Sequence, residues 1–133
     1  MEPVVFSAVD EIGQEFVMAL GPLEATRSAK LRRATEIAVS SALGVSRSEL
    51  QAKTRRSASV AFARQIAMYL VHVVGGMTLT ESGQLFGRDR TTAAHACCIV
   101  EDRRDDPSFD KLLERLENSV LKLMAAASPA GAC

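Results

Sequence analysis

The residues best suited to a specific chemical role lie between positions 78 and 101, where two short segments flank a polar turn. Four of them share one side of a helix with about 3.6 residues per turn: Thr91, Thr92, His95 and Cys98. Hydroxyl groups and an imidazole near a helix N-terminus can reach base edges and thymine methyl groups in the major groove, and the same terminus favours a nearby phosphate. Duplex DNA is therefore the first ligand that this pattern suggests, although many helical hairpins share the pattern.

Catalytic interpretations of the same residues are weaker. His95 and Cys98 could form a nucleophilic pair, but no third residue is evident that would orient it. The two His and three Cys residues lack the spacing of a metal site. No Gly-Lys dipeptide occurs in the 133 residues, so a Walker-type phosphate loop is not expected. We therefore expect no enzyme activity and no metal, nucleotide or other cofactor.

Composition places the chain among small helical domains. Its 133 residues suit one domain, and a hydrophobic content of 47% is enough to fill a core. The apolar run at residues 66–74 is too short to span a membrane, and no signal peptide is evident. An odd number of cysteines indicates a reducing compartment. We expect a cytoplasmic, nucleoid-associated protein.

Charge is distributed unevenly along the chain although the net charge is zero. Residues 27–64 contain nine Lys or Arg and two Glu, a net charge of +7, so the remainder carries −7. A solvated helical face is the ordinary explanation of such a run. Polyanion binding becomes the better explanation only if DNA-reading features lie beside it.

Helical periodicity accounts for nearly every segment. Apolar residues at 5, 9, 12 and 16 predict a first helix, stopped by Gly21-Pro22, and the stripe Leu31, Ala34, Ala38 and Ala42 predicts a second over about 25–43. Capping boxes at residues 46–49 and 78–81 each start a short helix. The segment 53–57 is predicted to be an ordered basic loop, and Ala67, Leu70, Val71 and Val74 predict a helix over 60–74. The fold class is all-α.

Two further helices complete the prediction. One runs from about Thr91 to Asp102 with Asp89 or Arg90 near its N-cap, and its inward stripe is Ala93, Ala96, Cys97 and Val100. The last helix packs inward through Phe109, Leu112, Leu113, Leu116 and Val120. Asp102, Asp105, Asp106 and Asp110 could hold a cation, but a loop that caps the last helix is favoured. The residues after Met124 are expected to be disordered. Two short helices joined by a turn with Gly indicate a helix-turn-helix over about 78–101.

The sequence itself resembles a known family. Residues 56–70 (RSASVAFARQIAMYL) resemble the opening helix of the DNA-binding domain of the bacterial replication initiator DnaA. Residues 78–87 (TLTESGQLFG) look like its first motif helix, and residues 88–97 (RDRTTAAHAC) are similar to its signature. The resemblance is close over 54–101 and extends weakly over about 28–124. It implies a Trp-repressor-like helix-turn-helix domain over 26–124, with an amphipathic helix over 1–25 outside it and a tail over 125–133.

The resemblance also implies roles for individual residues. Arg56 matches an arginine that enters the minor groove, where the narrow, electronegative groove suits a guanidinium. Arg64, Gln65, Leu79 and Thr80 match positions that contact the DNA backbone. The base-reading set matches Asp89, Thr91, Thr92 and His95. The full set expected to contact DNA is Arg55, Arg56, Arg64, Gln65, Leu79, Thr80, Arg88, Asp89, Arg90, Thr91, Thr92 and His95.

Departures from the family pattern concern specificity more than DNA binding. Arg90 stands where the family usually has His, and the turn at 86–88 is one residue shorter than the common pattern, which would shift the recognition helix slightly. Cys98 and Ile99 replace residues that are often basic, and Phe62 replaces one that is often polar. The expected partner is therefore double-stranded DNA with a DnaA-box-like site.

The expected function is modulation of replication initiation or transcription without ATPase activity. The alternative is an adaptor that keeps this fold and binds the initiator or its regulator. The amphipathic segment at the N-terminus could serve such docking, although packing on its own domain is the favoured explanation of its apolar face.

Overall fold

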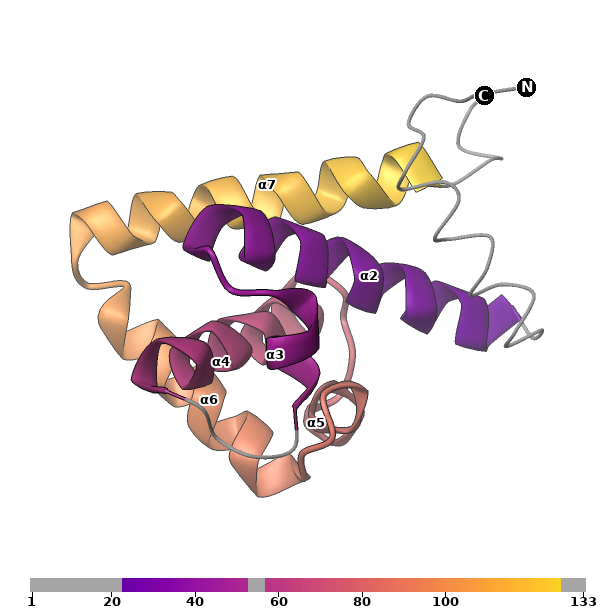
Figure 1. Cartoon of the computed structure of the whole chain (residues 1–133), viewed down its shortest axis with the longest axis horizontal. Helices are drawn as coiled ribbons and strands as arrows, with labels where there is room; N and C mark the ends of the chain where they lie inside the picture. The colour runs from indigo at the N-terminus through magenta and orange to yellow at the C-terminus, as the bar shows by residue number, and fades with distance from the viewer. Residues whose placement is uncertain (1–22, 53–56, 128–133) are drawn as a thin grey trace.

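The computed structural model describes residues 23–52 and 57–127 (Figure 1). These residues form helices and no strand: α2 (Leu23–Leu43), α3 (Arg47–Gln51), α4 (Ala58–Val73), α5 (Leu79–Leu85), α6 (Arg90–Arg103) and α7 (Pro107–Ala127). The predicted all-α fold class is confirmed for this part of the chain. The helix expected near residues 5–16 and most of the expected C-terminal tail lie outside the described residues.

The helix boundaries differ from the predicted ones by one to three residues. α4 begins at Ala58 instead of residue 60, because the Ser57 hydroxyl accepts a hydrogen bond from the Val60 amide at 3.2 Å and so caps the helix ahead of its apolar run. α7 continues past Met124 to Ala127, since a run of alanines favours helix. α2 begins at Leu23 instead of about residue 25, and it ends at Leu43 as predicted, directly before Gly44 with φ +70°.

Both predicted capping boxes are present. At the start of α3 the Glu49 amide donates to Ser46 Oγ at 3.1 Å, and the Ser46 amide donates to Glu49 Oε1 at 3.0 Å. At the start of α5 the Glu81 amide donates to Thr78 Oγ1 at 3.1 Å, and the Thr78 amide donates to Glu81 Oε1 at 2.9 Å. Each box satisfies two amides that the helix leaves unpaired, so these short helices begin at defined residues.

α4 lies at the centre and packs against α2, α3, α5 and α6, while α7 packs along α2 (Figure 1). Ile66, Leu70 and Val71 of α4 are completely buried. Burial of each such side chain is worth about 1.5–3 kcal/mol relative to exposure. The helix-turn-helix is therefore built on the most buried helix of the domain.

The α2 stripe was predicted correctly except at its end. Leu31, Ala34 and Ala38 are buried, but Ala42 is exposed. Ala42 instead lines a surface groove between α2 and α7. Leu112 of α7, predicted to point inward, is only half-buried.

α2 crosses the C-terminal end of α4 at a glycine. A Cβ at Gly75 would lie 2.1 Å from Leu31 Cδ2 and 2.7 Å from the Val71 carbonyl oxygen, so no larger residue fits here. Arg27 Nη2 donates to the Gly75 carbonyl at 2.9 Å. This close approach sets the position of α2 on α4.

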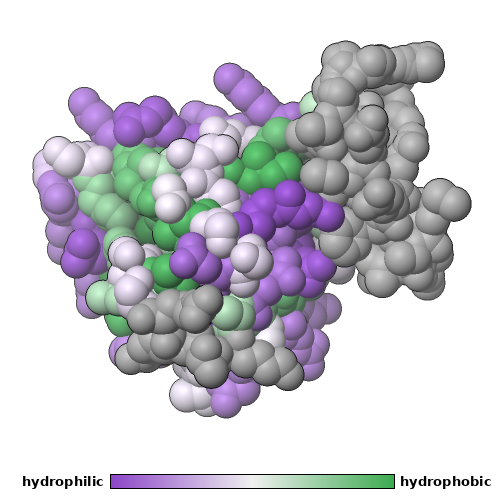
Figure 2. All heavy atoms as spheres, viewed as in Figure 1, coloured by the Kyte–Doolittle hydropathy of each residue, from purple (hydrophilic) through white to green (hydrophobic). Residues whose placement is uncertain are grey.

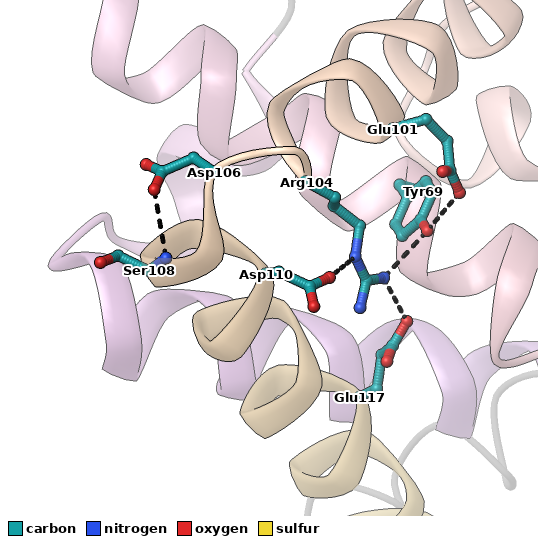
Figure 3. Close-up of polar contacts among 7 residues, drawn as sticks. All are labelled: Tyr69, Glu101, Arg104, Asp106, Ser108, Asp110 and Glu117. Atoms are coloured by element: carbon teal, nitrogen blue, oxygen red, sulfur yellow. Dashed lines mark hydrogen bonds and ion pairs between the residues drawn. The ribbon is translucent and has the colours of Figure 1, made fainter.

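Arg104 joins α4, α6 and α7 through one guanidinium (Figure 3). Its Nε donates to Asp110 Oδ1 at 2.6 Å, and its Nη1 lies 2.8 Å from Glu117 Oε2 and 3.0 Å from the Tyr69 hydroxyl. The Tyr69 hydroxyl donates in turn to Glu101 Oε2 at 2.6 Å. Burial and the bond to Glu101 raise the pKa of Tyr69 to about 12, and the bond to Glu117 contributes most to raising the pKa of Arg104. The three helices are thus linked at one point.

α3 is held by buried charges. Glu36 of α2 is 1% exposed, accepts a hydrogen bond from Gln51 Nε2, and has Arg47 Nε 3.5 Å from its carboxylate. Burial raises the pKa of Glu36. From the other side, Arg64 of α4 donates from Nε to the Leu50 carbonyl and from Nη2 to the Glu49 carbonyl, both at 2.9 Å. These bonds fix the end of α3.

Candidate nucleic-acid interface

α5 and α6 form the two helices of a helix-turn-helix, joined by a turn over residues 86–89. The Gly87 amide donates to the Gln84 carbonyl at 3.1 Å, the Arg88 amide donates to the Gly83 carbonyl at 2.8 Å, and Gly87 adopts φ +69°. This is a Schellman motif, which needs a residue that tolerates positive φ at its centre. The conformation of the turn is therefore set by main-chain hydrogen bonds from Gly87 and Arg88 to the end of α5.

Gly83 lets α5 pack directly on that turn. A Cβ at this position would lie 2.6 Å from the Asp89 carbonyl oxygen and 2.8 Å from the Arg88 carbonyl oxygen. Both neighbours are backbone atoms, so neither can move aside without moving the start of α6. Sequence reasoning missed this role. A glycine inside an otherwise helical segment was the available signal.

Asp89 caps α6, as the sequence predicted for Asp89 or Arg90. Its Oδ1 accepts the Thr92 amide at 2.9 Å. That backbone hydrogen bond, with one from the Thr92 side chain, lowers the pKa of Asp89. The carboxylate is therefore ionised at neutral pH and the N-terminal turn of α6 is ordered around it.

The two faces of α6 divide as predicted. Ala93, Ala96 and Val100 are completely buried, and Cys97 is partly buried against the core. The opposite face carries the exposed residues Arg90, Thr91, Thr92, His95 and Cys98. Small residues at the buried positions allow α6 to approach α4 and α5 closely, so the rigid core holds the exposed face at a fixed angle.

A surface hollow lies where α5 and α6 begin, and its lining combines residues from both helices and the turn. The lining residues are Thr80, Gln84, Gly87, Arg88, Asp89, Arg90 and Thr92. Five of them belong to the set predicted to contact DNA. Gln84 was not predicted, although it follows Thr80 by one helical turn and so shares its face. The structure therefore brings Thr80, Arg88, Asp89, Arg90 and Thr92 together.

Arg88 ties the turn to the end of α3. Its Nη2 donates to the Ala52 carbonyl at 3.1 Å, and its Nη1 lies 3.3 Å from both the Phe86 and Gly87 carbonyl oxygens. Ala52 directly precedes the segment that carries Arg55 and Arg56. Both of those predicted contact residues lie outside the described residues, but the chain that leads to them is fastened beside the turn.

Three predicted backbone contacts have a different environment from the rest. Arg64 is 4% exposed and its guanidinium is engaged with α3, so the structure gives it an internal role and removes it from the set that we propose to contact DNA. Leu79 is partly buried against the core, and Gln65 is also partly buried. Sequence similarity could not distinguish Arg64 from a surface arginine, because its partners are main-chain carbonyls 14 and 15 residues away.

Other chemical groups in the described residues have structural roles. His72 Nδ1 lies 2.6 Å from the Met77 carbonyl oxygen. Asp106 Oδ1 accepts the Ser108 amide at 3.1 Å at the start of α7, and Asp110 pairs with Arg104, which fits the capping interpretation of the aspartates (Figure 3). Within residues 23–52 and 57–127, no group of three or more His, Cys, Asp or Glu is arranged to hold a metal ion.

Cys97 and Cys98 are both free thiols. Burial raises the pKa of Cys97, which keeps this thiol protonated at neutral pH and lowers its reactivity. None of the helices in the described part of the chain combines the length and apolar character that crossing a membrane requires.

Comparison with known proteins matches this region to one family. The family model described as the bacterial dnaA protein helix-turn-helix matches residues 36–100. The chain is 38% identical over 78 residues to the chromosomal replication initiator protein DnaA of Treponema denticola, covering 57% of this chain and 16% of that protein. It is 46% identical over 63 residues to the protein of the same name from Symbiobacterium thermophilum, covering 46% of this chain and 14% of that protein. No solved structure gives a significant match.

The chain thus spans about one sixth of the length of these curated relatives, and the matched part contains α3, α4, α5 and most of α6. The match covers the capped helices, the Schellman turn and the exposed face of α6 described above. It does not indicate enzymatic activity. Residues 36–100 therefore match the helix-turn-helix domain of the bacterial dnaA protein, which is a DNA-binding domain.

Proposed function

We propose that this chain binds double-stranded DNA sequence-specifically, at sites similar to those read by the chromosomal replication initiator, through the exposed face of α6. The observation that carries the proposal is the arrangement of Thr91, Thr92 and His95. All three are exposed at the N-terminal half of a helix whose cap is formed and whose opposite face is completely buried. A rigid helix with short polar side chains at its N-terminal end suits insertion into the major groove.

The hollow beside α6 supports a phosphate contact in the same complex. Thr80 of α5 and Arg90, the first residue of α6, both line it, as does Asp89, whose carboxylate already accepts the Thr92 amide. The positive end of the helix macrodipole and the side chains of Thr80 and Arg90 favour a phosphate at this position. Phosphate contacts would fix the register of the protein on the duplex, while the α6 face would read bases.

In this arrangement, Arg55 and Arg56 would contact the neighbouring minor groove of the DNA. The support is positional: Arg88 holds Ala52 against the turn, so the basic segment begins beside the recognition helix. A guanidinium in a narrow minor groove is favoured by the enhanced negative potential there. Arg90 and Cys98 would alter the preferred site relative to other members of the family, because each side chain is exposed on the contact face.

The same proposal has a regulatory consequence. A chain that reads such sites could compete with the initiator for them, or could bring a partner to them, and so modulate replication initiation or transcription. We expect binding to be independent of ATP, because the contact surface consists of helix-turn-helix residues. Competition on an origin fragment, measured with and without ATP, would test this consequence.

The test of DNA binding is an unbiased selection from a random duplex library, followed by titration of the selected site and a scrambled control. Affinity for the selected site should exceed that for the scrambled site and should fall steeply with salt. Thr92→Ala and His95→Ala should each cost about 1–3 kcal/mol on the selected site and leave weak nonspecific binding unchanged. Asn118→Ala, which removes an exposed polar side chain of α7, is the matched control.

If both α6 variants bind the selected site as tightly as the parent chain, the recognition helix is assigned wrongly. One observation supports a second candidate, an adaptor that binds the initiator or its regulator: α6 exposes Cys98 where the family often has a basic residue. An adaptor would show no preference for any duplex and would instead be retained by purified initiator.

A further inference from the structure

An apolar groove lies between α2 and α7, on the side of the domain that carries no part of the helix-turn-helix. Its lining residues are Ile37, Ala38, Ser41, Ala42, Leu112, Arg115, Leu116, Ser119, Lys122 and Leu123. Figure 2 shows apolar surface in the band where α7 and α2 run side by side. Leu112 and Leu123 are only partly buried. The packing of α2 on α7 therefore leaves apolar surface uncovered.

Among the described residues that line this groove, the charged ones are basic, Arg115 and Lys122, and both are exposed on α7. The preferred occupant is therefore apolar along one face and acidic on the flanks. A peptide with both properties would bury its apolar side chains between the helices and place its carboxylates near the two cations.

Residues 1–22 of the same chain have this composition. They contain four acidic residues, Glu2, Asp10, Glu11 and Glu15, and no Lys or Arg, which gives a side-chain charge of −4. Val5, Val9, Ile12 and Phe16 fall on one face at helical spacing. The segment complements the groove both in hydrophobicity and in charge.

The lengths also match. Val5 and Val9 lie 16 and 12 positions before Gly21, which corresponds to about 24 and 18 Å in a helix. α2 begins at Leu23, directly after Gly21-Pro22, and Ile37 lies 14 positions further along, about 21 Å from that start. A helix that folds back at Gly21-Pro22 would place Val5 about 24 Å from the turn, so it reaches the groove without a longer linker.

We propose that residues 1–20 dock as an amphipathic helix into the groove between α2 and α7 of their own molecule, antiparallel to α2. Attachment to α2 gives the segment a high local concentration at the groove, so a modest interface is enough to hold it. The docked segment covers the face opposite the proposed DNA surface, and docking does not depend on the proposed function.

The experiment is methyl nuclear Overhauser spectroscopy on the full chain with labelled Ile, Leu and Val methyl groups. Cross-peaks should connect Val5, Val9 or Ile12 with Ile37, Leu112 or Leu123. A second sample, mixed from labelled and unlabelled chains, separates contacts within one molecule from contacts between two. Contacts seen only between molecules would show that a second copy occupies the groove, and an absence of contacts would show an empty groove. Either result overturns the proposal.

Charge and hydrophobicity variants test the mode of docking. Ile12→Glu should abolish the cross-peaks while the α4 core signals remain unchanged. Lys122→Glu should weaken them, and Lys111→Glu, the same change at an exposed α7 position outside the groove lining, should not. Glu15→Lys should restore part of the loss in Lys122→Glu. Equal effects of Lys122→Glu and Lys111→Glu would contradict the proposed charge contact and, with it, the docking mode.

Discussion

The helix-turn-helix and the α2–α7 layer use different means to hold helices together. In the helix-turn-helix, short helices are fixed by caps, by the turn at Gly87 and by direct contact between backbone atoms at Gly83. In the layer, two helices of 21 residues each pack by apolar stripes, and α7 is tied to α4 and α6 through Arg104. The first region therefore needs few side chains for its own structure.

The two regions therefore differ in the side chains that they leave exposed for contact with a partner. Because main-chain bonds hold the turn and the start of α6, the polar side chains of the α6 face remain exposed. In the layer, polar groups are used internally, and the surface left over is the apolar groove lined by Leu112 and Leu123. One side of the domain suits a polar, charged ligand and the other suits an apolar segment.

Gly83→Ala should produce the largest effect and should break the first region alone. An alanine in a helix interior normally stabilises by up to about 1 kcal/mol relative to glycine. Here the added Cβ meets the carbonyl oxygens of Arg88 and Asp89 within 3 Å, so we expect a loss of about 1–3 kcal/mol in unfolding free energy and a loss of DNA affinity of at least tenfold. Urea unfolding and titration of the selected duplex measure the two effects. A stabilised variant with unchanged affinity would refute the close contact.

Arg104→Met should have the converse effect. It leaves Asp110, Glu117 and the Tyr69 hydroxyl without their shared partner, so we expect a loss of about 1.5–3 kcal/mol in unfolding free energy. DNA affinity measured well below the melting temperature should change little, because α6 keeps its cap and its buried face. Lys111→Met, which removes a positive charge at an exposed position of α7, is the control. A specific loss of DNA affinity in Arg104→Met would show that the two regions are coupled.

Local features of the fold could be predicted from the sequence, and they were the ones that depend on a few neighbouring residues. The capping boxes at Ser46 and Thr78 and the inward stripe of α6 are examples, because each is defined within one or two helical turns. The exposed face of α6 followed from the same periodicity. The family resemblance then pointed to DNA.

Features that depend on distant segments could not be predicted. The burial of Arg64 and the bond from Arg88 to Ala52 both join parts of the chain that the sequence does not place side by side. Arg64 shows the consequence for the candidate site: a residue type suited to phosphate can be used instead to cap α3. The hydrogen bonds of Arg104 to Tyr69 and Glu117 could not be predicted for the same reason.

Arg88→Lys separates two roles of this residue with a smaller effect. Lysine keeps the charge but lacks the planar guanidinium that spans the Ala52, Phe86 and Gly87 carbonyls. If Arg88 positions the turn, affinity for the selected duplex should fall several-fold in both Arg88→Lys and Arg88→Ala. The salt dependence of binding should stay nearly constant, because no phosphate contact is lost. A drop of about one in the salt slope for Arg88→Ala alone would identify Arg88 as a phosphate contact instead.

The smallest predicted effect is the acid sensitivity of the α6 cap. The Thr92 bonds lower the pKa of Asp89 in the folded state below the ordinary value of about 3.9, so this carboxylate stabilises the fold above that pH and loses its contribution as the pH falls through the lowered pKa. In Asp89→Asn the amide oxygen can still cap Thr92, but the site no longer titrates. Carboxyl chemical shifts of Asp89, followed with the Thr92 amide, should give a common midpoint below 3.9. The stability difference between parent and variant should narrow over the same acid range. A midpoint at or above the ordinary value would mean that the cap forms only part of the time, and the start of α6 would then be less rigid than its role as the reading end of the motif requires.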